Sequence, residues 1–170
     1  QSKSIKSEIK RLTDTKCVYF PSWSENNIGR KNKVKTNELV KKNKNTTRII
    51  FAGNIGESQS FVTLVKAANI LKNNKKNIEW IIIGDGRWKK KLLNLINKKK
   101  LNNQIKLIDT IPVNKVRSYL NHADLLYLSL KNNPTFKKTI PGKLQTYMSI
   151  GKPIIGSISG ETSKIISEAK

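Results

Sequence analysis

The sequence predicts an α/β fold built around a doubly wound parallel sheet. Three observations point to it: short uninterrupted apolar runs, amphipathic segments between them, and glycine or polar residues where the runs end. Apolar runs without alternation indicate strands buried on both faces, as in parallel sheets that helices cover from both sides. We therefore expect five strands that alternate with helices from residue 48 onward.

The first 47 residues are expected to come from the region between two domains of a larger protein. Residues 1–16 are polar and predict a short helix, and the apolar run Cys17–Phe20 predicts a strand that ends at Pro21. Residues 22–47 are rich in Asn, Lys and Ser and predict a linker. The chain begins without an initiator methionine or an apolar signal-like segment, which also favours a piece of a larger protein.

Residues 48–170 are predicted to form the folded domain. The predicted strands are 48–52, 78–83, 105–108, 124–130 and 153–155. Helices are marked by apolar residues that recur on one face. These inner-face residues are Phe61, Leu64, Val65, Ala68 and Leu71; Trp88, Leu92, Leu95 and Ile96; Val116, Tyr119 and Leu120; and Ile165, Ile166 and Ala169.

The segment Lys138–Gly156 carries the most informative motif of the chain. It predicts a helix that starts on Pro141, ends at Gly151 and leads into a buried strand. The free N–H groups of a first helical turn attract anions, and Thr139 and Lys143 stand beside them. Since ligands of such sheets bind at the carboxyl ends of the strands, we expect a nucleotide phosphate here.

The loops after the other strands offer weaker signals. Gly53, Asn54 and Gly56 follow the first strand, where glycine lets a ligand approach the backbone; a plain tight turn is the alternative. Asp85 follows the second strand and either caps a helix or touches a ligand. Trp23 is expected to pack at an interdomain hinge, with ligand contact as the alternative.

Composition limits the classes of partner. The net charge of +23 suggests nucleic acid or an anionic membrane surface, but the basic residues are spread along the chain rather than concentrated. We therefore expect no dedicated nucleic-acid binding, with peripheral contact at the inner face of a cell membrane left open. One cysteine, Cys17, excludes an internal disulfide and fits a cytoplasmic protein. With His122 as the single histidine, we expect no metal and no bound cofactor.

The order of these motifs resembles glycosyltransferase family 4 over about residues 17–170. The matching segments are Phe20-Pro21-Ser22-Trp23, Phe51–Gly56, Gly84–Arg87, Ala123-Asp124, Thr139–Lys143, Tyr147-Met148 and Gly151–Ile154. The chain looks like the Rossmann-like, C-terminal, donor-binding half of a GT-B enzyme. Within the family it is similar to the branch of bacterial L-fucosamine transferases.

The resemblance implies a retaining, metal-independent glycosyltransferase of the hexosyl or N-acetylhexosaminyl type, active in cell-surface polysaccharide synthesis. Its donor would be a nucleotide sugar, UDP-linked by expectation, and the acceptor would bind to a missing N-terminal domain, without which the fragment is expected to be inactive. The turn from Thr139 through Pro141 and Gly142 to Lys143 would hold phosphate. Backbone near Thr110 and Ile111 would meet the base. No catalytic residue is identified.

Departures from the family pattern shift the expected roles. Lys138 and Thr146 stand where many members carry two glutamates, so Lys138 is expected to meet phosphate and Thr146 to hold the ribose more weakly. Asn54 and Gln59 replace an Arg and a Lys, which places more weight on Lys143. The alternatives are a nucleotide-sugar 2-epimerase, disfavoured by the scarcity of carboxylates and histidines, and a basic α/β module that binds nucleic acid or anionic membrane.

Overall fold

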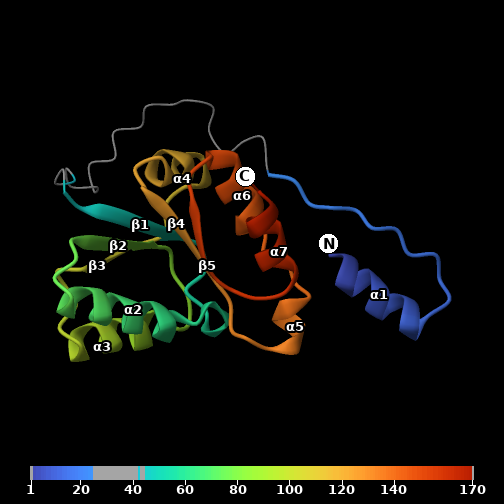
Figure 1. The fold of residues 1–170 in the computed structure, drawn as a ribbon, viewed down its shortest axis with the longest axis horizontal. Helices are drawn as coiled ribbons and strands as arrows, with labels where there is room; N and C mark the ends of the chain where they lie inside the picture. Colours follow the sequence, from blue (N-terminus) through green and yellow to red (C-terminus); the bar gives the residue numbers. More distant parts are fainter. Residues whose placement is uncertain (1, 25–41, 43–44, 170) are drawn as a thin grey trace.

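The computed structural model describes residues 2–24, 42 and 45–169 and contains a five-stranded parallel sheet between two layers of helices (Figure 1). The strand order is β3-β2-β1-β4-β5, and each neighbouring pair is parallel. The strands are β1 Thr47–Ala52, β2 Ile78–Ile83, β3 Ile105–Ile108, β4 Leu125–Ser129 and β5 Ile154–Ser157. The predicted fold class is confirmed.

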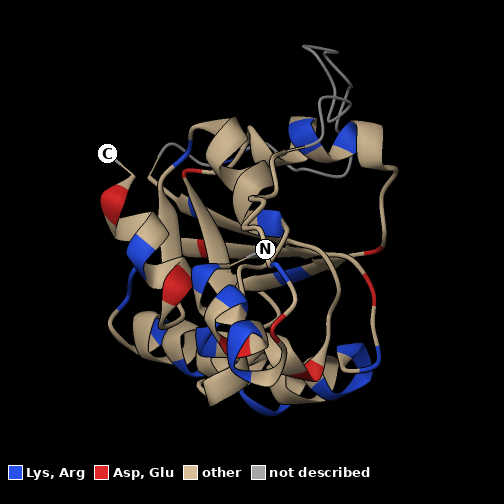
Figure 2. Cartoon of the chain, turned by 90° about the vertical axis from the view of Figure 1, so that its right-hand side faces the viewer, with Lys and Arg blue, Asp and Glu red and all other residues tan. Residues whose placement is uncertain are grey.

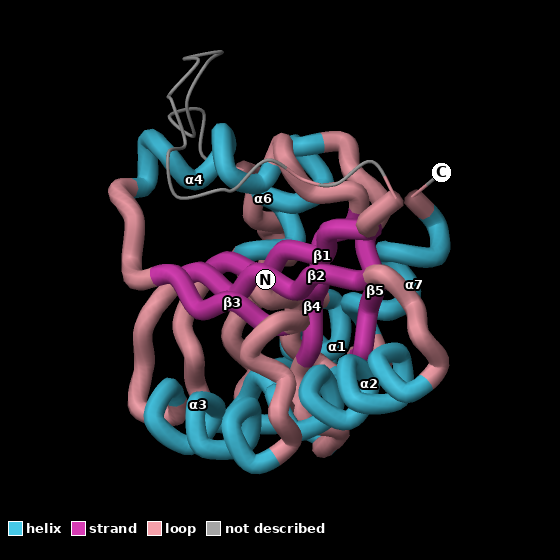
Figure 3. Tube along the Cα trace, turned by 90° about the vertical axis from the view of Figure 1, so that its left-hand side faces the viewer, coloured by secondary structure: helices cyan, strands magenta, loops and turns pink. Residues whose placement is uncertain are grey.

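Helices cover both faces of this sheet (Figure 3). On one face lie α2 and α3; on the other lie α4 and α6, while α7 packs beside β5. Their bounds are α2 Phe61–Asn73, α3 Lys89–Lys98, α4 Val113–Leu120, α6 Lys143–Ile150 and α7 Glu161–Glu168. The chain order reverses between β1 and β4, which creates the crevice where ligands of such sheets bind.

Alternate residues of each central strand enter the two halves of the core. In β1, Ile49 and Phe51 pack toward α2 and α3, whereas Ile50 and Ala52 pack toward α4 and α6. Successive strand residues point to opposite faces, so a strand covered on both sides needs apolar residues throughout. This packing explains the uninterrupted apolar runs of the sequence.

Several predicted boundaries are wrong by a few residues. The helix expected to start on Pro141 begins at Lys143, with Gly142 as its N-cap, although it ends at Gly151 as predicted. The fourth strand is shorter than 124–130, and the fifth runs from Ile154 to Ser157 rather than from 153 to 155. Ala169 is exposed rather than inside, because α7 ends one residue before it.

The N-terminal segment forms a helix but not the expected strand. Helix α1 spans Lys3–Leu12 and lies beside α5 Pro134–Lys137 and α7 (Figure 1). Backbone and side-chain groups of Ser4 bond to Glu161 of α7. The run Cys17–Phe20 has no strand pairing, and Phe20 is 67% exposed, because no neighbouring strand edge lies beside it in the described part of the chain. The predicted linker 22–47 falls largely outside the described residues.

The strongly basic composition does not form one patch on the side of the molecule in Figure 2, where Lys and Arg appear on several separate helices and loops. In the ranges that the structure describes, no helix is long and apolar enough to cross a membrane.

Candidate functional site

Two adjoining cavities open at the carboxyl end of β1. One, of about 430 Å³, lies against the start of α6 and is called here the α6 cavity; Trp23, Gly53, Val116, Gly142, Lys143 and Thr146 contribute to its lining. The other, of about 280 Å³, is the strand-end cavity, lined in part by Asn54, Gly84, Thr110 and Ile111. Ala52, Gly53 and Val116 line both, so the two cavities form one continuous depression.

Lys143 supplies the cation of the α6 cavity. As the first residue of α6, it sends its side chain back over the end of β1, where Nζ lies 4.0 Å from the centre of the Phe51 ring. Its Nζ donates a hydrogen bond of 2.8 Å to Oε1 of Gln59. Burial lowers the pKa of Lys143 to about 7, since an ammonium group loses its hydration there.

The start of α6 leaves backbone donors for a ligand. Helix α6 begins at Gly142 without a side-chain cap, and the N–H groups of a first helical turn have no partners within their own helix. One of them, on Leu144, is bonded to the carbonyl oxygen of Pro141 at 2.9 Å. The remaining N–H donors, the helix dipole and Lys143 together give this end of α6 a positive electrostatic potential.

Helix α6 is anchored to β1 by Tyr147. Its buried hydroxyl accepts a hydrogen bond of 2.9 Å from the backbone nitrogen of Ala52, one residue before Gly53. Burial raises the pKa of the Tyr147 hydroxyl well above its usual value. The side chain therefore stays uncharged, and its hydrogen bond to Ala52 holds the first turn of α6 over the end of β1.

The glycines at the strand ends have two different roles. Gly53 has φ +139°, and a Cβ there would come within 3.3 Å of Lys143 Nζ, so its missing side chain leaves room for the lysine. Gly84 has φ +137°, and a Cβ on it would lie 2.1 Å from the carbonyl oxygen of Gly53. Gly84 thus lets the loops after β1 and β2 pack backbone to backbone.

Seven of the eleven residues predicted to bind the ligand lie in the linings of the two cavities. Gly53, Asn54, Thr110 and Ile111 line the strand-end cavity, and Gly53, Gly142, Lys143 and Thr146 line the α6 cavity. Asp85 also lines the strand-end cavity, where its carboxylate accepts a bond from Gly86 N at 2.8 Å and faces Lys89 at 3.7 Å. The N-cap of α3 is Trp88, and no side chain caps that helix, so the capping interpretation of Asp85 is wrong and its contact with a ligand stays a prediction.

Four other predicted residues lie outside both cavity linings: Gly56, Lys138, Thr139 and Pro141. The hydroxyl of Thr139 donates to the carbonyl oxygen of Thr135 at 2.8 Å, so it points back to α5 rather than toward Lys143. Lys138 forms an ion pair of 2.7 Å with Glu8 of α1, which holds the pKa of Glu8 below its usual range through that hydrogen bond and charge.

Two contributors to the site were given other roles by the sequence. Gln59 was noted as the replacement of a cation, and the structure shows its amide oxygen holding Lys143, a residue 84 positions away. Trp23, expected at a hinge, lines the α6 cavity while remaining 71% exposed, with its ring edge-on to Phe20 at 5.2 Å. Its place in the cavity lining is consistent with the ligand contact that the sequence left open as the alternative.

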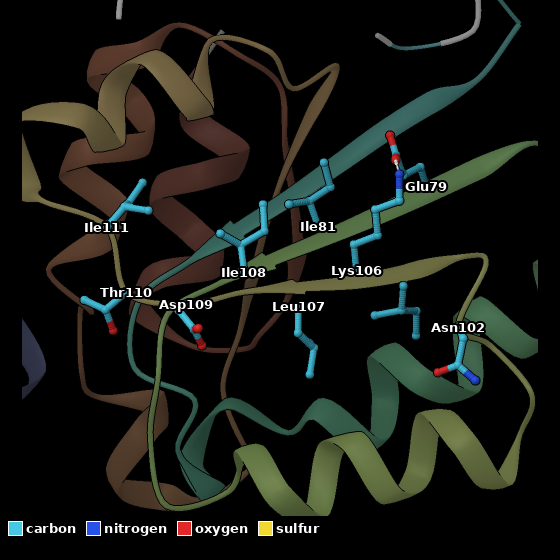
Figure 4. Close-up of a pocket in the computed structure, with 10 residues that line it drawn as sticks. Glu79, Ile81, Asn102, Lys106, Leu107, Ile108, Asp109, Thr110 and Ile111 are labelled. Atoms are coloured by element: carbon cyan, nitrogen blue, oxygen red, sulfur yellow. Dashed lines mark hydrogen bonds and ion pairs between the residues drawn. The ribbon is translucent and has the colours of Figure 1, made fainter. Parts of the chain in front are cut away.

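A separate groove of about 570 Å³ runs along β3 at the edge of the sheet (Figure 4). At one end, Glu79 accepts hydrogen bonds of 2.7 Å from Lys106 and from Arg48. At the other end lie Thr110 and Ile111, which also border the strand-end cavity. The charged side chains of the groove, Glu79, Lys106 and Asp109, all form ion pairs.

Metal ligands do not gather at this site. Across the described ranges, no three side chains of His, Cys, Asp or Glu come together in a way that could hold an ion. The donors at the α6 cavity are an amine and backbone N–H groups, which suit an anionic ligand.

Comparisons with known proteins give one consistent family. The family model described as Glycosyl transferases group 1 matches residues 33–170. The 2-deoxystreptamine N-acetyl-D-glucosaminyltransferase of Niallia circulans is 27% identical over 138 residues, which are 81% of this chain and 33% of that protein. The amylovoran biosynthesis glycosyltransferase AmsK of Erwinia amylovora is 29% identical over 65% of this chain and 27% of its own length.

Solved structures share the fold. WaaG, a glycosyltransferase involved in lipopolysaccharide biosynthesis, superposes over 98% of this chain and 45% of its own, with a TM-score of 0.72 and 12% identity. HepE of Anabaena, solved with UDP-glucose, covers 71% of this chain and 32% of its own, with a TM-score of 0.58 and 16% identity. The chain thus spans about a third of the length of the curated relatives and less than half of the length of the chains in these two structures.

Proposed function

The chain belongs to the group 1 glycosyl transferases, and we propose that it is the nucleotide-sugar-binding half of a retaining, metal-independent GT-B enzyme. The observation that carries the proposal is Lys143, placed at the uncapped start of α6 and beside Gly53 in the α6 cavity. A cation, helix N–H groups and a backbone without a side chain converge there, which is the chemistry that a diphosphate needs.

In this proposal the donor lies along the two cavities. Its diphosphate meets Lys143 and the first turn of α6, and its ribose lies near Thr146. The base enters the strand-end cavity, where backbone groups of Thr110 and Ile111 bind its edge. Lys138, now paired with Glu8, stands outside this arrangement and meets phosphate only if that ion pair opens.

Catalysis by this half consists of stabilising the leaving group. When the bond between the sugar C1 and the diphosphate oxygen breaks, the electron pair stays on the diphosphate, and the cation and helix dipole at α6 stabilise the new charge. The acceptor hydroxyl forms the new bond to C1 on the same face, and its proton passes to the departing diphosphate oxygen. We assign acceptor binding to a further, N-terminal domain, so the 170-residue chain should bind donor without turnover.

The donor is proposed to be UDP-linked, carrying a hexose or an N-acetylhexosamine. In support, HepE binds UDP-glucose, and the relative from Niallia circulans is named for N-acetyl-D-glucosaminyl transfer. Polysaccharide assembly as the pathway is supported by AmsK and WaaG. The narrower resemblance to L-fucosamine transferases stays a prediction, since none of the relatives reported above is named for that activity. A cytoplasmic location, with peripheral membrane contact, is part of the same proposal.

Thermal unfolding of the chain with UDP, CDP, GDP and a short oligonucleotide tests the proposal. We expect UDP to raise the melting temperature most, because binding to the folded state alone stabilises it. Lys143→Ala should abolish the shift, and Lys164→Ala, on the exposed face of α7, should preserve it. A shift with the oligonucleotide alone would instead favour a basic nucleic-acid module, and an unchanged shift in Lys143→Ala would remove the phosphate from α6.

A further inference from the structure

The surroundings of the Lys143 ammonium group are unusual for a cation. Its neighbours are the ring face of Phe51 and the amide oxygen of Gln59, and both of those side chains are buried. An aromatic ring and one amide oxygen attract a cation, but they replace only part of the hydration that a free ammonium group has. The charged form of Lys143 is therefore poorly stabilised by its protein neighbours.

Carboxylates on the neighbouring elements are bonded elsewhere. Glu57, in the turn that also carries Gln59, pairs with Lys131. After β2 and β3, Asp85 and Asp109 both face Lys89. In the described part of the chain, no carboxylate forms an ion pair with Lys143, and Gln59, to which it donates a hydrogen bond, is neutral.

The other charged groups near this end of the sheet are cations, or carboxylates that bond to other residues, such as Glu161 to Ser4. Lys138 precedes α6 and is held by Glu8, and α4 carries Lys115 and Arg117. Helix α6 itself contains no acidic residue. None of these groups offers Lys143 a counter-charge, so burial acts on its ammonium group without compensation by an ion pair in the described part of the chain.

We propose that the chain binds its diphosphate ligand with the uptake of one proton by Lys143, so that donor affinity falls as the pH rises above neutral. The inference rests on the proposed function, because it takes the diphosphate to Lys143. The amine gains a proton from solvent, and the resulting ammonium group and the diphosphate oxygens then hydrogen-bond as an ion pair. The lowered pKa of Lys143, about 7 in the empty site, places the change within the neutral range.

Calorimetric titration with UDP-glucose tests the linkage. The diphosphate diester of this probe keeps its charge across the neutral range, so a pH effect on binding reports on the protein. We expect close to one proton taken up at about pH 8, measured in two buffers with different ionisation heats. Affinity should fall about tenfold per pH unit between about pH 7.5 and 9, because one proton is coupled to binding.

Gln59→Glu is the matched variant. A carboxylate at this position pairs with Lys143 and keeps it charged, so binding should become weaker but independent of pH, without proton uptake. A wild-type chain that binds UDP-glucose with the same affinity at every pH would overturn the linkage and leave the proposed function standing. No binding from about pH 6 to 9 would overturn both.

A titration of the free chain tests the protonation of Lys143 independently of ligand binding. In NMR spectra of lysine side chains, one signal should titrate near neutral pH in the free wild-type chain and be missing in Lys143→Arg. If every lysine of the free chain titrates in the ordinary lysine range, Lys143 has no proton to gain at neutral pH, and the inference is wrong.

Discussion

The buried hydroxyl of Tyr147 accepts a hydrogen bond of 2.9 Å from the backbone nitrogen of Ala52. The same hydroxyl donates to the carbonyl oxygen of Ala52 at 3.4 Å, and the two bonds join the second turn of α6 to the last residue of β1. They also set the distance between Lys143, one turn earlier in α6, and Phe51, the neighbour of Ala52 in the strand. The cation of the candidate site is therefore positioned by a tyrosine that does not carry charge itself.

Tyr147→Phe is expected to lower the free energy of unfolding by about 1–2 kcal/mol, because the buried N–H group of Ala52 loses its partner. Urea unfolding measures the loss. Tyr127→Phe is the control: its hydroxyl is also buried but has no hydrogen-bond partner among the described residues, so the change should be smaller. Equal losses in the two variants would contradict the role of the Tyr147–Ala52 bond.

Two glycine substitutions should separate folding from binding. Gly84→Ala is expected to destabilise the chain by about 2–4 kcal/mol, since its Cβ would overlap the Gly53 carbonyl oxygen and its φ is positive. Gly142→Ala meets no atom within 4 Å and should change stability by less than about 0.5 kcal/mol. Its methyl group would nevertheless enter the α6 cavity and weaken UDP binding. Thermal unfolding with and without UDP checks both outcomes.

Trp23 should report on ligand binding by fluorescence. Of the three tryptophans, Trp23 lines the α6 cavity, whereas Trp80 and Trp88 belong to the core on the α2 and α3 side of the sheet. UDP is expected to change the emission of the wild-type chain, because an exposed ring near the ligand changes its environment most. Trp23→Phe should lose this change. Its persistence in that variant would show that Trp23 lies away from the bound nucleotide.

Glu79 is expected to make stability depend on pH. Burial alone would raise its pKa, but hydrogen bonds and charges from Lys106 and Arg48 outweigh burial and hold the pKa below its usual range. A carboxyl group with a lowered pKa in the folded state stabilises above its unfolded pKa, and the contribution disappears as the pH falls through the folded value. Glu79→Gln should therefore cost about 1–3 kcal/mol at neutral pH and little in acid.

Urea unfolding at neutral and acidic pH measures that difference. Glu57→Gln is the comparison: it also removes a paired carboxylate, but the pair with Lys131 is exposed, where ion pairs add little to stability. A loss for Glu79→Gln that stayed constant into acid would show that its charge is not the cause.

Much of the fold follows from local patterns. The runs Ile78–Ile83 and Ile105–Ile108 are strands with the predicted bounds, because an uninterrupted apolar run between polar turns leaves few other ways to bury it. The run Cys17–Phe20 has the same character but forms no strand, since a strand needs a neighbour to pair its backbone groups. The composition of a run cannot supply that neighbour.

Local sequence patterns predicted the residues of the candidate site less well than they predicted the strands. Lys143 and Gly53 were singled out from the sequence and do line one cavity. Thr139 was expected beside Lys143, yet its hydroxyl bonds to Thr135, because a short helix intervenes between the strand and α6. The hydrogen bond between Lys143 and Gln59 could not be predicted from local sequence patterns, because 84 positions separate the two residues.

The periodicity of the sequence predicts the order of strands and helices, because it shows which faces are buried. It also predicts that a helix starts at the ligand edge of the sheet. Periodicity does not predict which residues surround the Lys143 amine. Whether that amine meets a carboxylate or an amide and an aromatic ring depends on which strand ends and turns the sheet brings together. The packing of these distant segments places at the centre of the candidate site a buried lysine that pairs with no carboxylate of the described residues.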